Sequence, residues 1–360
     1  MAFLAIFATV SNIYKPMKHM TTFKTKQSFG LLVCLAMLGA CTTEEPQVVT
    51  PEETPVEEPV DSLDNPWGFT RLFWEDNFND DQLNESVWWI QNTDSYNNEL
   101  QCYKHNHGNV TMGVEPVSGN KCMIITAKRD TCAEHDKCFT SGKISTQVGP
   151  WTTWVSTTYG RVEASIKLPK TYKGLWPAFW MMGTDVGNGV GWAACGEIDI
   201  LEAGASAGMS TVEKSEAYIN GACHWGSGWE NGKHWYSSRF KQIPYSLQDD
   251  RFHLYTLVWT QKYIRCYVDL DEYPDQEPYF SMEISRDKIR EGVANNAPKY
   301  FHKPFYLMFN LAVGGDYTGI RQPENVTAMA LEGGEARMYV DFVRIYHAPD
   351  EAYHTPCEIE

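Results

Sequence analysis

The stretch that decides the fold is Phe305–Val313, FYLMFNLAV, in which every residue except Asn310 is apolar or aromatic. A strand of this composition is apolar on both faces, as expected of a strand between two packed layers. Further short segments are rich in β-branched and aromatic residues and are bounded by Gly, Pro, Asn or Asp. They are Gly160–Leu168, His253–Trp259, Tyr263–Asp269 and Arg337–Tyr346.

Helical periodicity is nearly absent from the rest of the chain, so we expect an all-β protein. Many short strands in one globular stretch predict two packed antiparallel sheets. The chain is long for this number of strands, and the long loops that remain usually shape a binding groove.

The composition excludes several classes of protein. Hydrophobic residues make up 43% and aromatic residues 13% of the 360 residues, which disfavours disorder and coiled coil. The net charge is −16, of which residues 65–360 carry −12, because residues 1–41 hold four Lys and no acid and residues 42–64 eight acids and no base. An acidic body without a basic face argues against nucleic acid and polyanionic substrates. We expect a neutral ligand.

Residues 1–41 are typical of an export signal. Lys24 and Lys26 precede an apolar run, residues 29–40, that is too short to span a bilayer and fits the core of a signal peptide. The small residues before Cys41 resemble a bacterial lipobox, in which the cysteine is lipidated. We therefore expect a bacterial lipoprotein at the outer membrane or cell surface, or in the periplasm if the anchor faces inward. An ordinary cleaved signal with an incidental cysteine is the alternative.

The remaining chain has a simple organisation. Residues 42–64 are rich in Pro, Glu and Thr and hold no aromatic residue, which predicts a disordered acidic linker. The composition then becomes globular, without an internal repeat or a second linker. We expect one domain, residues 65–350, followed by a tail, residues 351–360, and we expect a monomer.

The chemistry is expected in the hexapeptide EIDILE, residues 197–202. In a regular strand Glu197 and Asp199 share a face, whereas Glu202 points to the other face. A β-bulge of one residue between Asp199 and Glu202 would return all three carboxylates to one face and keep the aliphatic side chains in the core. Two carboxyl groups about 5–5.5 Å apart are typical of a retaining glycosidase. Asp199 would hydrogen-bond one of them and separate their protonation states.

Alternatives for this pattern are a solvated acidic strand face and a Ca²⁺ site of three carboxylates. The upstream stretch Gly174–Gly183 favours a sugar groove, because Trp176 and Trp180 share parity and indole rings stack on the apolar faces of sugars. Taken alone, that stretch fits two core tryptophans equally well.

Six motifs carry a resemblance to a known family. They are residues 97–101 NNELQ, 158–164 TYGRVEA, 174–183 GLWPAFWMMG, 194–202 ACGEIDILE, 310–315 NLAVGG and 339–346 YVDFVRIY. In this order they resemble glycoside hydrolase family 16, most closely its laminarinase-like branch. The resemblance implies a two-sheet antiparallel β-jelly-roll sandwich with a concave substrate cleft.

The same resemblance implies a retaining endo-glycosidase that needs no cofactor for catalysis. Glu197 is then the nucleophile, Glu202 the general acid/base and Asp199 the residue that assists the nucleophile. The implied glycone-side contacts are Asn98, Glu99, Trp176, Trp180 and Trp192. Many relatives also hold a structural Ca²⁺ away from the cleft, for which Glu75 and Asp341 are the candidates.

The expected substrate is a β-1,3- or mixed-linkage glucan of the laminarin type, cleaved internally by double displacement. The sequence departs from the laminarinase pattern after Glu202 and at Ala193, which stands where proline is usual. There it resembles endo-β-galactosidases acting on N-acetyllactosamine-type mucin O-glycans or keratan, the alternative substrate class. Further candidates for substrate contacts, each with a purely structural alternative, are His224 and Trp225 and the loop residues Trp151, Trp154 and Trp229.

Two other functions remain open. A non-catalytic carbohydrate-binding lipoprotein would keep the tryptophans but does not need the three acids together. A transglycosylase of the same family would share the covalent step and pass the sugar to another sugar.

Eight cysteines remain after Cys34 and Cys41 are set aside, which permits up to four disulfides. Cys132 and Cys138 are the easiest local pair to join. No cysteine and histidine spacing indicates zinc.

Overall fold

The computed structural model describes residues 68–349 except 131, 133–136, 150–151, 229–232, 329–330 and 332. The predicted signal peptide with Cys41, the linker 42–64 and the tail 351–360 lie outside these residues. By their contacts, all described residues fall in one unit, Glu57–Glu360. None of the helices in this part of the chain is long and apolar enough to cross a bilayer.

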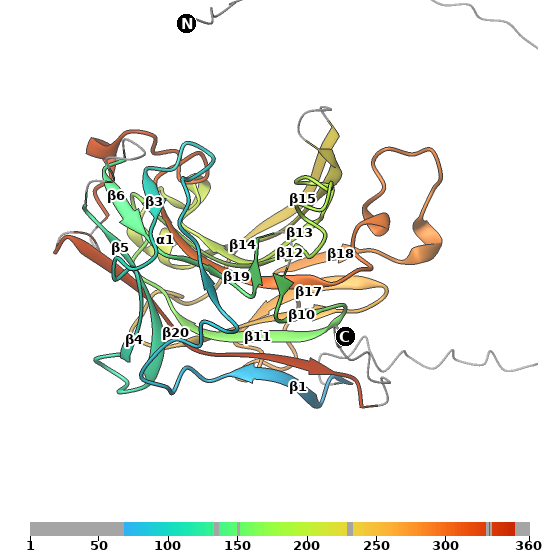
Figure 1. Ribbon diagram of the computed structural model, residues 1–360, viewed down its shortest axis with the longest axis horizontal. Coiled ribbons are helices and arrows are strands. Elements are labelled where there is room, and N and C mark those ends of the chain that lie inside the picture. The colour runs from blue at the N-terminus through green and yellow to red at the C-terminus, as the bar shows by residue number, and fades with distance from the viewer. Residues whose placement is uncertain are drawn as a thin grey trace, which may run out of the picture. The chain divides into compact units, whose positions relative to one another are not determined.

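Two sheets built from antiparallel strands form a sandwich, as predicted (Figure 1). The first sheet has ten strands in the order β18-β17-β16-β11-β20-β5-β6-β3, with β1 beside β20 and β4 beside β5; its β3–β6 pair is parallel. The strands are β1 (Arg71–Asp76), β3 (Gln101–Tyr103), β4 (Val110–Val114), β5 (Lys121–Lys128), β6 (Phe139–Ser141), β11 (Gly160–Lys167), β16 (His253–Trp259), β17 (Tyr263–Val268), β18 (Phe280–Glu283) and β20 (Glu335–His347).

The second sheet has eight strands in the order β15-β14-β13-β12-β19-β7-β2, with β10 beside β19. The strands are β2 (Trp89–Ile90), β7 (Lys143–Ser145), β10 (Ser156–Thr157), β12 (Leu175–Gly183), β13 (Glu197–Ala203), β14 (Tyr218–Gly228), β15 (Lys233–Gln242) and β19 (Phe305–Val313). A separate pair consists of β8 (Gln147–Val148) and β9 (Thr152–Thr153). We call the surface of the eight-stranded sheet that points away from the ten-stranded sheet the outer face.

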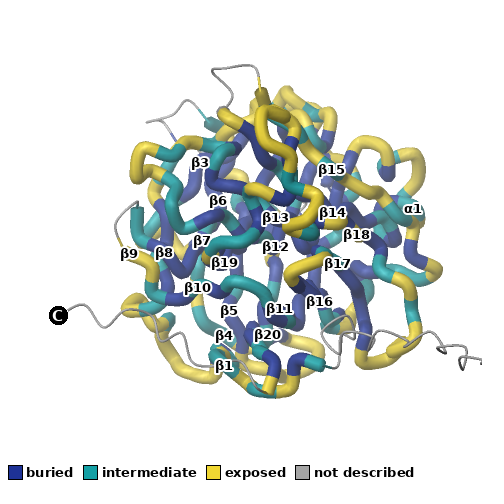
Figure 2. The backbone as a smooth tube through the Cα atoms, turned by 90° about the vertical axis from the view of Figure 1, so that its right-hand side faces the viewer, coloured by how far each residue is buried: buried dark blue, intermediate teal, exposed yellow. Residues whose placement is uncertain are grey.

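The strands β16 and β19 have the predicted bounds, and β11, β17 and β20 differ from the predictions by one or two residues at their ends. All nine residues of β19 are buried, as its composition predicts. Its odd-numbered residues belong to the core between the sheets, where Phe309 stacks on Phe179 with ring centroids 4.5 Å apart. Its even-numbered residues point to the outer face. Figure 2 shows the buried backbone running through the middle of both sheets.

Helices are few and short in the described chain. The α-helix α1 (Val212–Glu216) begins at Thr211, whose side chain accepts a hydrogen bond from the Lys214 amide. Single turns of 3-10 helix occupy Ser206–Gly208, Arg286–Lys288, Ala297–Lys299 and Pro323–Asn325.

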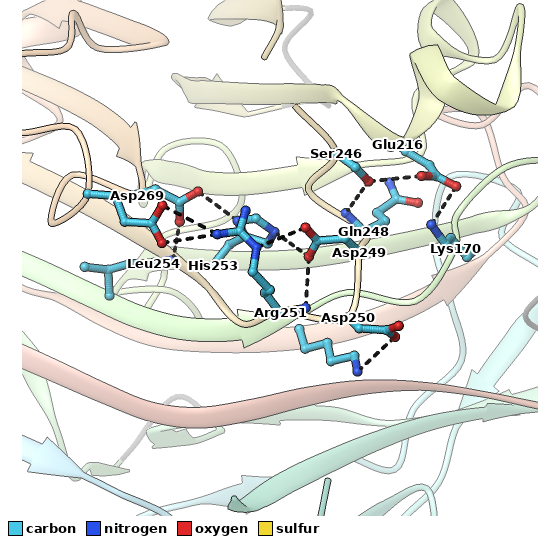
Figure 3. A network of polar contacts seen from close by, with 12 residues as sticks. Lys170, Glu216, Ser246, Gln248, Asp249, Asp250, Arg251, His253, Leu254 and Asp269 are labelled. Carbon is cyan, nitrogen blue, oxygen red and sulfur yellow. Dashed lines mark hydrogen bonds and ion pairs between the residues drawn. The ribbon is translucent and has the colours of Figure 1, made fainter. Parts of the chain in front are cut away.

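A buried histidine ties the segment after β15 to the ten-stranded sheet (Figure 3). His253 Nδ1 lies 2.8 Å from Asp269 Oδ2 and its Nε2 lies 3.1 Å from Asp249 Oδ1. Burial opposes protonation of this ring, but the hydrogen bond and charge of Asp269 outweigh it, and the pKa of His253 is raised. A protonated His253 therefore bridges two carboxylates across the turn that Asp249, Asp250 and Arg251 form.

The predicted Cys132–Cys138 disulfide is wrong, because Cys132 is bonded to Cys102. A local antiparallel bridge pairs Cys132 with Lys137 rather than with Cys138, which is exposed and free. Cys132 instead meets a partner 30 residues away in sequence, which only the fold brings close.

Candidate active site

The three predicted carboxylates lie on β13, in the middle of the eight-stranded sheet. On the adjacent strand β14, Asp199 pairs with Ala222 and Glu202 pairs with Asn220. β13 therefore advances three residues where β14 advances two. This confirms the predicted bulge, which brings the three acids to the outer face.

The extra residue is Ile200, which has no partner in the register between β13 and β12. Ile198, Ile200 and Leu201 are fully buried in the core between the sheets, as expected. Asp199 and Glu202 keep only 5% and 8% of their surface exposed. The strand thus presents its acids on one side and its aliphatic side chains on the other.

Each glutamate is oriented by an indole N–H group. Trp176 Nε1 donates to Glu202 Oε1 at 3.0 Å, and Asn220 Nδ2 donates to the other oxygen at 2.7 Å. Trp192 Nε1 donates to Glu197 Oε2 at 3.0 Å. These contacts place Trp176 and Trp192 beside the acids, as the sequence predicts.

A pair of histidines lies beside the other two acids. His224 Nε2 lies 3.4 Å from Asp199 Oδ2 and 4.0 Å from Glu197 Oε1, and its Nδ1 lies 2.9 Å from His234 Nε2. Burial, followed by the charge of His224, lowers the pKa of His234. A neutral His234 accepts a hydrogen bond from a protonated His224, whose second N–H group then faces the acids.

Burial dominates the electrostatics of the three acids. It raises the pKa of Glu197, Asp199 and Glu202 each to about 8, and the charge of Asp199 adds to the effect on both glutamates. Three neighbouring buried carboxyl groups do not all ionise together at neutral pH. The cluster therefore holds at least one proton there, and a protonated acid beside an ionised one is the arrangement that acid-assisted nucleophilic attack requires.

A chain of hydrogen bonds orients Trp180 on the outer face. Its Nε1 donates to Asn310 Oδ1 at 2.7 Å, and Asn310 Nδ2 donates to the Tyr103 hydroxyl at 3.2 Å. That hydroxyl donates to Glu99 Oε2 at 3.3 Å. Burial raises the pKa of Glu99, which is only 7% exposed. The structure therefore places Glu99 beneath Trp180, with the ammonium group of Lys143 4.9 Å from the indole ring.

Two exposed aromatic rings extend this region along β15. Tyr236 and Phe240 are 63% and 41% exposed, and they pair with His224 and Asn220 on β14. Since paired residues share a face, both rings stand on the outer face beside the acids.

Trp225, predicted as a substrate contact, lies elsewhere. It follows His224 on β14 and so points the opposite way, into the core, with 5% of its surface exposed. Its Nε1 donates to Asn295 Oδ1 at 3.0 Å. Alternation along the strand excludes it from the outer face. Of the loop tryptophans, Trp151 and Trp229 lie outside the described residues.

Asn98 lies on an exposed turn at one end of the sheet, where its side-chain amide donates to both carboxylate oxygens of Asp316, at 2.9 and 3.1 Å. Half-buried Trp154 lies in the segment after β9, where its amide donates to Thr146 O. Their predicted contacts with substrate stay predictions.

The two calcium candidates do not assemble a cation site as they are placed. Glu75 Oε2 accepts from Arg344 Nε at 3.2 Å, so a guanidinium group already neutralises it. Asp341 accepts from Asn120 Nδ2 at 3.2 Å. Among the described residues, the acidic, cysteine or histidine side chains close enough to share an ion are Glu197, Asp199 and His224. A structural calcium ion stays a prediction from the resemblance.

Four residues of the site have no signal in the sequence. Asn220, His234, Asn310 and Tyr317 contact acids or tryptophans that the sequence does identify. Strand register decides all of these contacts except that of Tyr317, which stacks on Trp176 from a loop with centroids 4.5 Å apart. The position of Asn310 inside an apolar strand was the one visible hint, since a buried amide needs partners.

Comparison with known proteins agrees with this geometry. The family described as Glycosyl hydrolases family 16 matches residues 104–283. A glucan endo-1,3-beta-glucosidase A1 from Niallia circulans is 31% identical over 76% of this chain and 37% of its own length. A keratan-sulfate endo-1,4-beta-galactosidase from Sphingobacterium multivorum is 31% identical over 54% of this chain and 38% of its own length. The chain thus spans well under half the length of either relative.

Among solved structures, a Bacteroides ovatus family 16 glycoside hydrolase from a mixed-linkage glucan utilisation locus has a similar fold. It is 35% identical, covers 76% of this chain and 99% of its own, and gives a TM-score of 0.61. That protein was crystallised with a G4G4G3G product.

Replacing Glu197 by Gln should stabilise the protein, and more so at high pH. Because the folded-state pKa of Glu197 is raised to about 8, its protonated form contributes stability below about pH 4.5 that is lost as the pH rises toward 8. The variant lacks this loss, so its melting temperature should exceed that of the wild type at pH 8.5 by about 2–4 °C for each kcal/mol relieved. The gain should nearly vanish at pH 4.5.

The matched control is Glu335→Gln, which removes an exposed carboxylate that pairs with Arg337 at 2.6 Å. It should show no gain at high pH. A melting temperature of Glu197→Gln that exceeds the wild type equally at both pH values, or falls below it at pH 8.5, would contradict the raised pKa.

Proposed function

Since the chain belongs to glycosyl hydrolase family 16, we propose that it is a retaining, endo-acting glycoside hydrolase that cleaves internal β-linkages of a neutral polysaccharide. The preferred substrate is β-1,3- or mixed-linkage β-glucan. The observation that carries this proposal is the bulge in β13, which gathers three buried carboxyl groups beside indole rings on one face.

The proposed mechanism assigns one role to each acid. Protonated Glu202 donates its proton to the glycosidic oxygen while ionised Glu197 attacks the anomeric carbon, and a covalent glycosyl-enzyme forms. Glu202, now ionised, takes a proton from water, which attacks the same carbon and releases the sugar.

Asp199 assists the nucleophile in this scheme. One of its oxygens, buried and without a hydrogen-bond partner among the described residues, is free to share a proton with Glu197. His224 faces both groups, and its protonated form favours their ionisation.

Charge and aromatic surface support a neutral glycan. The body of the protein carries −12, which repels sulfated or uronic acid chains. Trp176, Trp180 and Trp192 direct their N–H edges to protein acceptors, which leaves ring faces for the apolar faces of sugars. Tyr236 and Phe240 at the β15 edge are suited to the far end of the same chain.

The relatives favour glucan over the alternative. Proteins named as glucan endo-1,3-beta-glucosidase and as a mixed-linkage glucan hydrolase match three quarters of the chain, whereas the keratan-sulfate endo-1,4-beta-galactosidase matches about half. An endo-β-galactosidase acting on N-acetyllactosamine-type mucin O-glycans or keratan is the second candidate, favoured by the departure after Glu202. Transglycosylation and non-catalytic glycan binding remain rivals that kinetics separate.

We further propose export as a monomeric lipoprotein anchored through Cys41, at the outer membrane or cell surface. The lipobox-like sequence before Cys41 supports this. In a bacterial host the wild type should sediment with membranes and release into detergent, whereas Cys41→Ser should be soluble. Identical partitioning of the two proteins would contradict the anchor.

Replacing either glutamate should abolish polysaccharide turnover without unfolding the protein. Glu202→Gln should lower kcat by about 10²–10⁴-fold, because proton donation is lost. Glu197→Gln should form no glycosyl-enzyme at all. Reducing-sugar release measures turnover, circular dichroism measures folding, and NMR of the first product should show retained anomeric configuration. Glu335→Gln, far along β20, should behave as the wild type; an active Glu197→Gln enzyme would end the assignment.

A panel of glycans should identify the substrate class. We expect cleavage of laminarin or mixed-linkage β-glucan to exceed that of poly-N-acetyllactosamine and mucin O-glycans, because the acidic body and the relatives favour a neutral glucan. Product sizes over time should shorten from intermediate lengths, as internal cleavage requires. Preference for the lactosamine chains would establish the second candidate, and products longer than the substrate would indicate transglycosylation.

A further inference from the structure

The bulge in β13 is held from beneath by the other sheet. The carbonyl group of Ile200, the extra residue, accepts a hydrogen bond from the Tyr279 hydroxyl. Both residues are buried, at 0% and 1% exposure. Tyr279 directly precedes β18 of the ten-stranded sheet, and its amide donates to Cys266 O on β17 at 2.9 Å. The bond therefore joins the catalytic strand to the framework of the opposite sheet.

A glycine opens the way for this contact. Gly221 stands on β14 between Asn220 and Ala222, opposite the bulge. A Cβ atom at Gly221 would lie 2.6 Å from Phe280 Cβ and 3.0 Å from Tyr279 Cε2. Only a residue without a side chain lets the Tyr279 ring approach β14 closely enough to reach the strand beyond it.

We propose that Tyr279 is a positioning residue for the general acid/base. Its hydroxyl stabilises the bulge, and the bulge keeps Glu202 on the same face as Glu197. Without the hydroxyl, the Ile200 carbonyl is left without a partner in the interior, which favours a shifted backbone. A shift of one residue turns the Glu202 side chain toward the opposite face. The inference rests on the glycosidase function proposed above.

Tyr279→Phe tests the proposal, since it removes the hydroxyl and keeps the ring. On the polysaccharide, kcat/KM should fall about 10- to 100-fold, because a small displacement of a catalytic group has effects of this size. The loss should lie in kcat, with KM nearly unchanged, because the sugar contacts are untouched. The high-pH limb of the kcat/KM profile should move to lower pH, since a loosened Glu202 becomes more hydrated.

A substrate with an activated leaving group separates misplacement of the acid from general damage. A 2,4-dinitrophenyl glycoside of the oligosaccharide that the wild type releases needs no proton donation for the first step. Its kcat/KM should therefore change by less than about threefold in Tyr279→Phe. Equal losses on both substrates would overturn the proposal, and so would wild-type kcat/KM on the polysaccharide.

The matched control is Tyr255→Phe. Tyr255 is another fully buried tyrosine of the ten-stranded sheet, and its hydroxyl has no hydrogen-bond partner within the described structure. This variant should keep wild-type kinetics on both substrates, with melting temperatures confirming that all three proteins are folded at the assay temperature. Reduced polysaccharide activity in Tyr255→Phe equal to that of Tyr279→Phe would overturn the specific role.

Amide hydrogen exchange keeps this inference separable from the proposed function. Exchange in residues 199–203 should be faster in Tyr279→Phe than in the wild type and Tyr255→Phe. Unchanged exchange there overturns the role of Tyr279 even in an active enzyme. A wild type inactive on every glycan would instead defeat the proposed function, while faster exchange would still support the hold of Tyr279 on the bulge.

Discussion

One extra residue in β13 is the constraint on which the site depends. A strand alternates its side chains with period two, so Glu197 and Glu202 of a regular strand would lie on opposite faces. The buried face of β13 belongs to the core between the sheets, where a carboxyl group has no partners. The bulge moves Glu202 to the outer face, where Trp176 and Asn220 donate to both of its oxygens.

The site concentrates acids that burial disfavours. Glu197, Asp199 and Glu202 all have raised pKa values because the surrounding protein desolvates them, and Asp199 repels both neighbours. Such a cluster persists only on a rigid scaffold. The central strands β12, β13 and β19 provide it, since their inner residues are packed between two sheets. Function and stability oppose each other at this strand, as is common where charged groups must react.

Much of the fold follows from local patterns. Apolar and aromatic segments predict the strands β16 and β19 to the residue, because period and composition are properties of the chain itself. The parity rule also predicts the shared face of Trp176 and Trp180. The same rule, applied to His224 and Trp225 together, would have sent only His224 to the site. The disulfide of Cys132 with Cys102 escaped prediction because the partners are 30 residues apart and meet only through the fold.

The sequence by itself determined the sheet architecture, the trio of acids and the need for a bulge, because alternation and residue chemistry act over a few neighbouring positions. Only the tertiary structure decided what surrounds the acids. His234, Asn310 and Tyr279 reach the site through strand register and through packing of one sheet on the other. Those contacts join residues far apart in the chain, and no local preference specifies which of them will meet.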